Sequence, residues 1–325
     1  MKPLQTINVP KVQIGKTGLK ISTMGVGTSF LARPNVPVPE AEALETVEYA
    51  LTRGINFFDT APLYGSGNAE RRLGKALAGV PRDSFVIETK VGRLVQPDGS
   101  MVFDYSKDGI RRSLEESLTR LKMDRVDIVL LHDPDGFFSE PQQALELYPI
   151  LAEWRSQGMV KAIGAGMNQW MWLAEFAHRA HFDCFLLAGR YTLLNQEPAK
   201  EFLPLCQDKG ISVFVGGVYN TGILATGPVP GAFYEYQSAP EEIKEQVRRI
   251  EAICRRYKVP LSVAALQLPA AHSAVTSLIV GAKNPREIED NLQKIDQPVP
   301  VELWEDLQKA GVLDNSVPVP IPLKP

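Results

Sequence analysis

The chain has 325 residues, a length that suits one α/β barrel with additional loops. Hydrophobic residues make up 44% of it and charged residues 22%, a balance that argues against a disordered chain. No run of about 18 apolar residues suggests a membrane span. The net charge of −3, without a stripe of Lys and Arg, argues against nucleic acid as a partner.

The N-terminal segment and the cysteines bear on location. No apolar run lies between Lys2 and Lys16, so the segment lacks the hydrophobic region of a signal peptide. Cys184, Cys206 and Cys254 are odd in number and widely spaced, which suits reduced thiols and offers no paired-cysteine metal motif. We expect a cytoplasmic protein without a metal site.

The predicted elements begin with a hairpin and continue as an alternation of strands and helices. Residues 9–22 hold two short extended runs around a Lys-Thr-Gly turn, and we expect this hairpin to close the bottom of the fold. Eight apolar runs typical of strands follow, at 21–27, 55–58, 85–89, 126–131, 161–166, 184–188, 211–216 and 276–281. Longer segments between them carry apolar residues three and four positions apart, which predicts helices, at 39–54, 69–79, 106–121, 142–158 and 241–257. Such alternation indicates a parallel sheet.

Eight alternations fit either a closed barrel or an open doubly wound sheet. An open dinucleotide-binding sheet would carry Gly-x-Gly-x-x-Gly after its first strand. Here the segment at 25–34 reads GVGTSFLARP, which lacks the third glycine and a helix start. We therefore predict an α/β fold of the (β/α)8 barrel type, with residues 1–325 as one domain that includes the N-terminal hairpin and extra helices and loops.

Four ionisable side chains lie at or just beyond the ends of three consecutive predicted strands. Asp59, Lys90 and His132 each follow an apolar run, and Tyr64 lies five residues after Asp59. In a barrel, the carboxyl ends of the strands meet at one mouth, so these groups should converge. Each alone has an ordinary structural interpretation, as a cap, a solvated end or a core histidine. Together they form a combination suited to proton transfer.

A tyrosine needs help to exchange protons near neutral pH, because its ordinary pKa is about 10. We expect the Lys90 ammonium to lower the pKa of Tyr64 by favouring the phenolate. Asp59 would hold the lysine charged, and His132 would hydrogen-bond the substrate oxygen. No residue combination here forms a redox centre, so hydride transfer would require a nicotinamide cofactor across the mouth.

The order Asp-x4-Tyr, then Lys at a strand end, then Leu-His after the next strand resembles the aldo-keto reductase family. The blocks GINFFDTAPLYGSGNAERRLGKAL, ETKVG, SLEESLTRLKMDRVDIVLLHDPD, KAIGAGMNQ, GILATG and SLIVGAKNPREIEDNL match the family in order. The resemblance implies an NAD(P)-dependent oxidoreductase in which Tyr64 is the general acid or base, Lys90 and Asp59 tune it, and His132 orients the substrate. The segment IGAGMNQW is similar to a branch of L-fucose, D-threo-aldose, L-galactose and pyridoxal dehydrogenases. That similarity implies oxidation of a sugar at C1 to a lactone.

The same resemblance implies the cofactor contacts. Asn168 would contact the carboxamide, and Gly27 and Thr28 would line the nicotinamide end. Further contacts would come from the loop after the seventh strand and from the segment that binds the adenosine phosphate, at Gly222, Leu224, Gly281, Ala282, Lys283, Asn284, Glu287, Asp290 and Asn291.

The choice between NAD and NADP depends on the charge at the adenosine end. Relatives that prefer NADP carry a Lys-Ser pair and a later Arg, whereas the matching positions here are Gly281, Ala282 and Glu287. A carboxylate repels a 2′-phosphate, which favours NAD. Lys283 and Arg286 leave NADP open as the alternative.

Substrate contacts and the remaining alternatives are less defined. Trp170 is placed to offer an aromatic wall to a sugar, or to pack on its own helix. Arg190 either faces the substrate or pairs with a surface acid. NADPH-dependent reduction of aldehydes or ketones is the alternative activity, and a cofactor-binding regulatory subunit, of the kind known for potassium channels, is the alternative without catalysis. The complete set of four site residues favours an enzyme that acts on a small sugar or carbonyl compound.

Overall fold

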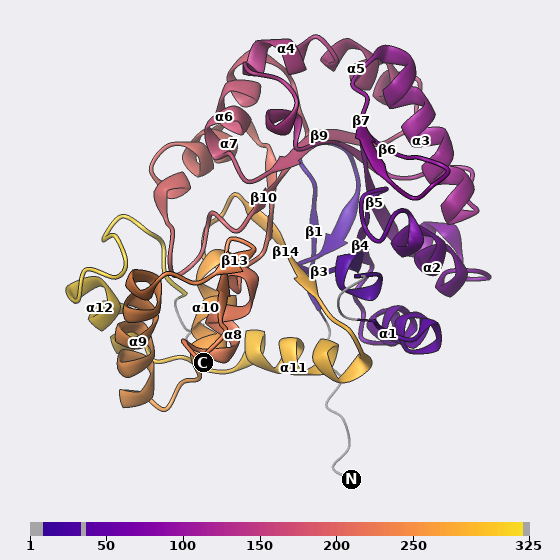
Figure 1. Ribbon diagram of the computed structural model, residues 1–325. Coiled ribbons are helices and arrows are strands. Elements are labelled where there is room, and N and C mark those ends of the chain that lie inside the picture. The colour runs from indigo at the N-terminus through magenta and orange to yellow at the C-terminus, as the bar shows by residue number, and fades with distance from the viewer. Residues whose placement is uncertain (1–8, 34–36, 321–325) are drawn as a thin grey trace.

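A closed barrel of eight parallel strands forms the centre of the molecule (Figure 1). The computed structural model describes residues 9–33 and 37–320. In barrel order from the first strand along the chain, the strands are β3 (Met24–Gly27), β4 (Phe57–Asp59), β5 (Val86–Val91), β8 (Ile128–His132), β9 (Ala162–Met167), β10 (Cys184–Ala188), β11 (Ser212–Gly216) and β14 (Val275–Gly281). Pairing of β14 with β3 closes the ring. The predicted barrel is confirmed, and each of the eight predicted runs overlaps a barrel strand. The run at 21–27 is divided, because residues 21–22 belong to the N-terminal hairpin and the barrel strand begins at Met24.

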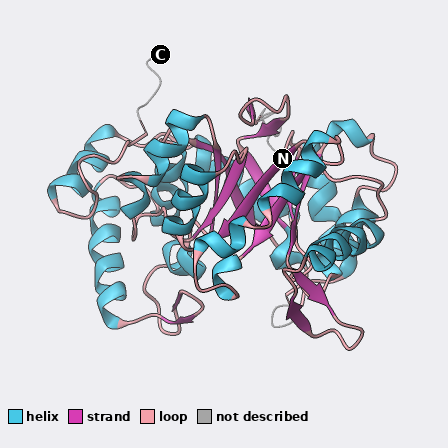
Figure 2. Ribbon diagram, turned by 90° about the horizontal axis from the view of Figure 1, so that it is seen from above, coloured by secondary structure: helices cyan, strands magenta, loops and turns pink. Residues whose placement is uncertain are grey.

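Helices surround the barrel (Figure 2). They are α1 (Glu40–Thr52), α2 (Asn68–Ala76), α3 (Lys107–Leu121), α4 (Pro141–Leu145), α5 (Tyr148–Ser156), α6 (Trp170–Arg179), α7 (Phe202–Lys209), α8 (Ile223–Thr226), α9 (Glu241–Arg256), α10 (Leu261–Ala270), α11 (Pro285–Asp296) and α12 (Val301–Lys309). Short 3-10 turns lie at Thr28–Leu31, Arg82–Ser84, Pro134–Gly136, Glu197–Ala199 and Asn220–Gly222. Within 9–33 and 37–320, no helix is both long enough and apolar enough to cross a bilayer.

One predicted helix is divided in two. The pattern at 142–158 predicts a continuous helix, but the structure separates α4 from α5 at residues 146–147. Pro149 lies in the first turn of α5. A proline has no N–H to continue the hydrogen bonds of a preceding helix, whereas it is tolerated in the first turn of a new one, so the second helix starts anew there.

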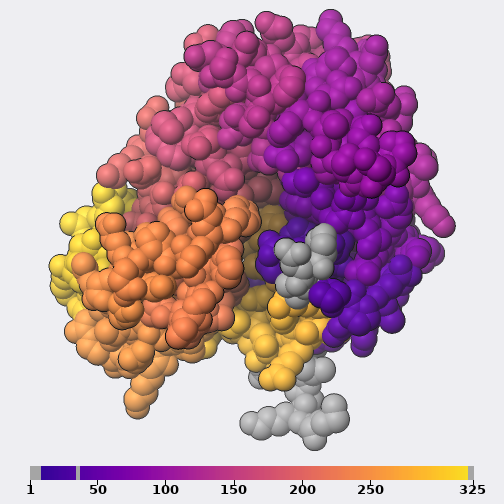
Figure 3. All heavy atoms as spheres, viewed as in Figure 1, coloured from indigo at the N-terminus to yellow at the C-terminus, as the bar shows by residue number. Residues whose placement is uncertain are grey.

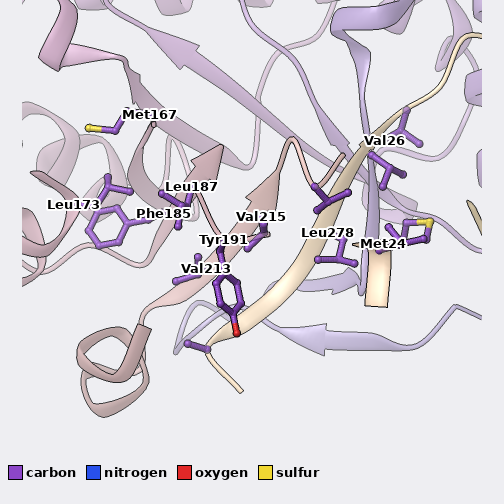
Figure 4. Packing of buried hydrophobic residues seen from close by; sticks show 14 of the residues in the cluster. Met24, Val26, Met167, Leu173, Phe185, Leu187, Tyr191, Val213, Val215 and Leu278 are labelled. Atoms are coloured by element: carbon purple, nitrogen blue, oxygen red, sulfur yellow. The ribbon is translucent and has the colours of Figure 1, made fainter. Parts of the chain in front are cut away.

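Side chains alternate between two cores because successive residues of a strand face opposite sides of the sheet. In β10, Cys184 and Leu186 belong to the cluster inside the barrel, whereas Phe185 and Leu187 belong to the larger core between the strands and the helices. Figure 4 shows part of this outer core, where Leu187 and Val213 lie near the ring of Tyr191. The same alternation places every second residue of β5 inside the barrel.

The N-terminal hairpin closes the amino-terminal end of the barrel, as predicted. Its strands are β1 (Lys11–Gln13) and β2 (Lys20–Ser22). Ile14, Leu19 and Ile21 are buried in the interior cluster with the first residues of several barrel strands.

Two more hairpins belong to the loops that follow β5 and β11. They are β6 (Arg93–Val95) with β7 (Met101–Phe103), and β12 (Phe233–Tyr234) with β13 (Gln237–Ser238). Both loops leave the carboxyl ends of barrel strands, so these hairpins flank the mouth, at the end opposite to β1 and β2.

Candidate active site

Three of the predicted site residues are inward-facing residues at the carboxyl ends of adjacent strands. Asp59 ends β4, His132 ends β8, and Lys90 is the penultimate residue of β5 between them. Figure 3 shows the molecule hollowed between the indigo N-terminal segment and the orange segment of the C-terminal half. The structure therefore brings together the groups that the sequence predicts at one mouth.

Tyr64 is held by a tight turn between β4 and α2. The N–H of Tyr64 donates to the carbonyl of Ala61 (3.1 Å), and its own carbonyl accepts from Ala69 (3.1 Å). Gly65 has a φ of +58°, and a Cβ there would lie 2.3 Å from the carbonyl oxygen of Ala32. Only glycine fits this position, so the turn holds Tyr64 against the mouth.

Lys90 is the centre of the charged cluster. It is 1% exposed, and its Nζ donates to Asp59 Oδ1 and to the carbonyl of Thr60 (3.0 Å). Burial disfavours its charged form, but the surrounding charges of Asp59, Tyr64 and Glu88 prevail and raise the pKa of Lys90 well above its usual value. Lys90 therefore stays a cation.

Tyr64 lies against both Lys90 and His132. The Lys90 Nζ lies 5.1 Å from the centroid of the Tyr64 ring, and the ring of His132 meets that of Tyr64 edge-on, with centroids 6.0 Å apart. Burial, then the charge of Asp59, raises the pKa of Tyr64, while Lys90 lowers it and the net change is upward. The expected direct effect of Lys90 is present, but the expected net lowering of the Tyr64 pKa is wrong because burial outweighs the effect of Lys90.

His132 is a neutral, nearly buried imidazole. It is 5% exposed, and burial, then the charges of Lys90 and Arg93, hold its pKa well below the usual value. Its Nε2 lies 3.7 Å from Asp133 Oδ2, and its Nδ1 has no hydrogen-bond partner among the described residues. A neutral imidazole at this place can orient a hydroxyl or carbonyl oxygen.

A buried brace fixes the end of β5 from outside the barrel. Glu70 of α2 accepts from Thr89 Oγ1 (2.7 Å) and from Nε of Arg120 on α3 (2.6 Å). Thr89 directly precedes Lys90, so the brace links the backbone that carries the lysine to two helices.

Three residues of the site were not predicted from the sequence: Glu88, Arg93 and Asp133. Glu88 lies inside the barrel with its Oε1 3.1 Å from Lys90 Nζ. Arg93 pairs with Asp133 (2.6 Å) beside His132 and lies over the ring of Phe103. Glu88 could have been found, because a residue two positions before an inward lysine in a strand faces inward as well. The Arg93 pair depends on loop geometry that no local pattern specifies.

Gly27 and Thr28, predicted for the nicotinamide end, lie at the end of β3 and at the start of the 3-10 turn that follows it. Gly27 is directly paired with Gly281, a residue predicted for the adenosine end, at the end of β14. A Cβ on Gly281 would meet the ring of Phe30 at 2.1 Å. Thr28 is fully buried, and its Oγ1 has no hydrogen-bond partner among the described residues, so it could accept a contact from a bound group.

Asn168 and the loop after β11 lie on the other side of the mouth. Asn168 Nδ2 donates to the carbonyl of Ala188 (2.6 Å). Gly222 has a φ of +108°, and the side chain of Leu224 is buried. The backbone N–H groups of Gly222 and Leu224 both donate to the carbonyl of Tyr219, so neither is a free donor for a cofactor.

The segment predicted for the adenosine end begins α11. Ala282 is buried, Asn284 caps the helix by accepting from the N–H of Glu287 (3.0 Å), and Glu287 Oε2 accepts from the N–H of Lys283 (2.9 Å). Asp290 lies 4.0 Å from Arg286. Asn291 is buried and accepts from Tyr219 Oη (2.9 Å). These residues form one end of a helix beside β14.

The two predicted substrate residues have structural contacts. Trp170 is half-buried and packs against the outer core. Arg190 pairs with Glu235, an exposed acid of the turn between β12 and β13. Of the two alternatives for Arg190, the structure has the surface pair.

Comparisons with known proteins agree with this arrangement. The model of the aldo/keto reductase family matches residues 23–311. The chain is 35% identical to pyridoxal 4-dehydrogenase of Microbacterium luteolum, over 93% of this chain and 98% of that protein. It is 36% identical to D-threo-aldose 1-dehydrogenase of a Pseudomonas species, over 91% and 96%.

A solved structure extends the likeness to the fold. The holo form of an aldo-keto reductase from Bacillus halodurans superposes with a TM-score of 0.75 at 28% identity, and the match covers 95% of this chain and 99% of that one. The chain belongs to the aldo/keto reductase family.

Proposed function

We propose that this protein oxidises an aldose at C1 to the lactone, with NAD as the favoured cofactor and Tyr64 as the proton-transfer residue. As a member of its family the protein is an NAD(P)-dependent oxidoreductase. The observation that carries the proposal is the position of Tyr64 at the mouth, between the buried Lys90 cation and the neutral His132. The similarity to D-threo-aldose 1-dehydrogenase supports an aldose as substrate.

In this proposal Tyr64 takes the proton of the C1 hydroxyl. Its phenolate is the reactive form, and each unit by which its pKa lies above the solution pH costs about 1.4 kcal/mol. Within the cluster, Lys90 is the cation that lowers the pKa of Tyr64. Asp59 keeps Lys90 charged and in place through their hydrogen bond.

His132 orients the substrate. A neutral imidazole can donate one hydrogen bond to the C1 oxygen, and that bond directs the hydroxyl proton toward Tyr64. Because the pKa of His132 is held low by burial and by two nearby cations, the imidazole keeps this role in mildly acidic solution.

The residues at the mouth fit a nicotinamide dinucleotide. Thr28 Oγ1, which has no hydrogen-bond partner among the described residues, follows Gly27, and Gly27 pairs with Gly281 at the ends of β3 and β14. The ring of Phe30 packs on Gly281. The N-terminus of α11, a helix of 12 residues, faces the same side and favours a phosphate. When bound, the cofactor supplies the hydride acceptor.

NAD is favoured over NADP because of Glu287. Its carboxylate is already engaged with the N–H of Lys283 and places a negative charge at the start of α11, where a 2′-phosphate would need positive charge. Arg286 is largely exposed and is the residue that could reverse this preference.

The proposal is tested by titrating the protein with NAD and NADP in parallel, with quenching of tryptophan fluorescence as the measure of binding. A steady-state panel then compares L-fucose and related aldoses, pyridoxal, and a simple aldehyde with NADPH. Tighter NAD binding with aldose turnover supports the proposal. Preference for NADPH with aldehyde reduction supports the alternative activity, and cofactor binding without turnover supports a regulatory role.

We also propose a cytoplasmic location. Cys184, Cys206 and Cys254 are all buried and unpaired, as expected for a chain that folds in a reducing compartment.

A further inference from the structure

Glu88 is a buried carboxyl group that the proton-transfer scheme above does not use. It lies two residues before Lys90 on β5, and both side chains face the barrel interior. It is 0% exposed. In the barrel register its direct neighbours are Asp59 on β4 and the apolar Ile128 on β8.

Glu88 lacks the hydrogen bonds that satisfy other buried acids of this chain. Both oxygens of Glu70 accept from a side chain, and Asp127 accepts from Arg82 and from the N–H of Ile87. Glu88 has its 3.1 Å contact with Lys90, but across 9–33 and 37–320 neither of its oxygens has a well-formed hydrogen bond. Burying a carboxylate with so few partners is costly, so its presence calls for an explanation other than stability.

The charges around Glu88 do not balance when every group is ionised. Asp59 and Glu88 face each other across the strands, and one ammonium, on Lys90, lies between them. Two carboxylates that contact the same ammonium in a dry interior cannot both be charged at low cost, so one of them holds a proton. Asp59 has the hydrogen bond to Lys90. Burial raises the pKa of Glu88 well above its usual range; the charge of Lys90 opposes this effect and the charge of Asp59 adds to it. Glu88 therefore holds the proton.

The state of Glu88 affects Tyr64 through Lys90. A charged Glu88 would offset the ammonium and oppose the phenolate, whereas a neutral Glu88 leaves the ammonium's attraction to Tyr64. Among the described residues that face Glu88, the other titratable groups are Asp59, Lys90, Tyr64 and the thiol of Cys184 on β10, whose own pKa is raised by burial and then by Glu88. A buried thiol of this kind stays neutral, so it does not alter the charge count.

We propose that Glu88 is a positioning residue that acts through Lys90: it is protonated at neutral pH, ionises before Tyr64 as the pH rises, and then competes with Tyr64 for the lysine's charge. This inference rests on the proposed role of Tyr64. It adds a second carboxyl group to the four residues that the family resemblance implies, and it makes the ionisation of Tyr64 depend on a group that no substrate touches.

The test measures ionisation of Tyr64 directly, by the tyrosinate absorbance of each protein minus that of the same protein carrying Tyr64→Phe. In Glu88→Gln the amide keeps the shape but cannot ionise, so we expect the titration midpoint of Tyr64 to move to lower pH by about one unit. The rise of kcat for oxidation with pH should move with it. Glu88→Asp, which keeps an acid, should shift the midpoint less.

Asp127→Asn is the matched control, because it alters a buried carboxyl group that bonds Arg82 and the N–H of Ile87, near the start of β5 and away from the mouth. It should lower thermal stability and leave the Tyr64 titration in place. A Glu88→Gln titration that superimposes on wild type, or an Asp127→Asn shift of equal size, would overturn the proposal. The absorbance needs no turnover, so a wrong substrate assignment leaves this test intact.

If Glu88→Gln fails to fold, infrared spectra of wild type and Glu88→Asp decide the matter. A protonated carboxylic acid C=O band at neutral pH that Glu88→Asp displaces supports the proposal. The absence of such a band overturns it.

Discussion

Tyr64 lies among groups that change its pKa in opposite directions. Burial and the Asp59 charge raise the pKa, and Lys90 lowers it. The residue is half-buried, at the boundary between the dry interior and the mouth. Small changes in the charge beneath it therefore have large effects on its proton affinity.

Replacing Tyr64 with Phe removes the hydroxyl and keeps the ring. Because the proton-transfer group is lost while the cofactor contacts are untouched, we expect kcat to fall by about 10²- to 10⁴-fold. The affinity for NAD, measured by fluorescence quenching, should stay nearly unchanged. Wild-type turnover in this variant would contradict the role assigned to Tyr64.

The low pKa of His132 predicts a dependence of stability on pH. In the unfolded chain His132 has an ordinary pKa of about 6.5 and gains a proton in mild acid. In the folded protein its pKa is held well below that value, so it stays neutral. The free energy of unfolding therefore falls as pH drops below about 6.5, by up to about 1.4 kcal/mol per pH unit. Between about pH 7 and pH 5.5, urea unfolding should show wild type losing about 1 kcal/mol more than His132→Gln. Equal losses would show that His132 titrates normally.

The four strand-end residues could be predicted because their positions follow from strand periodicity and barrel topology. The net direction of the Tyr64 pKa could not be predicted, since it depends on how completely the folded chain excludes water from one ring. Arg190 illustrates the same limit. Its partner Glu235 is 45 positions away, and only the folded loop brings the two together.

At the scale of elements, the contact between α2 and α3 supports the site. A Cβ on Gly74 of α2 would lie 2.2 Å from the carbonyl oxygen of Leu121, at the end of α3. The same two helices carry Glu70 and Arg120, which brace Thr89 beside Lys90. The close approach that glycine allows therefore also sets the brace.

Gly74→Ala should force the two helices apart, because the clash involves backbone that cannot rotate away. We expect the free energy of unfolding to fall by about 2 to 3 kcal/mol. Lys75→Ala, the next residue of the same helix, removes only an exposed ion pair with Glu40 and should leave the free energy of unfolding nearly unchanged. Chemical denaturation measures both, and similar losses in the two variants would contradict this account.

The barrel strands and the N-terminal hairpin were predictable from the sequence, whereas the two short hairpins beside the mouth were less so. The eight strands follow from apolar runs, whereas the β6 and β7 hairpin lies in a loop without such a run. Its turn at 97–99 reads Pro-Asp-Gly, a sequence typical of turns, so part of this hairpin could have been found. The β12 and β13 strands are two residues each, too short for any alternation to appear.

At the scale of the whole molecule, the two ends of the barrel differ in role: one contributes mainly to stability and the other carries the active site. The hairpin end is filled by Ile14, Leu19 and Ile21, and the mouth holds the titratable groups. Stability should therefore depend on the first end and chemistry on the second.

Ile21→Ala tests this division. Removing a fully buried side chain from the plug should lower the free energy of unfolding by about 2 to 5 kcal/mol, with the dissociation constant for NAD unchanged. Lys20→Ala, an exposed neighbour on the same strand, is the control and should be nearly neutral. A loss of NAD affinity in Ile21→Ala that Lys20→Ala lacks would show that the two ends are coupled.

The plugged end also determines when protons can enter or leave the interior. Because Ile14, Leu19 and Ile21 fill the far end, we expect Asp59, Glu88 and Lys90 to exchange protons with bulk water through the mouth, where the proposed substrate binds. A substrate bound there would block that route. We therefore expect these buried groups to re-equilibrate their protons with bulk water once in each catalytic cycle, after the product leaves and before the next substrate binds.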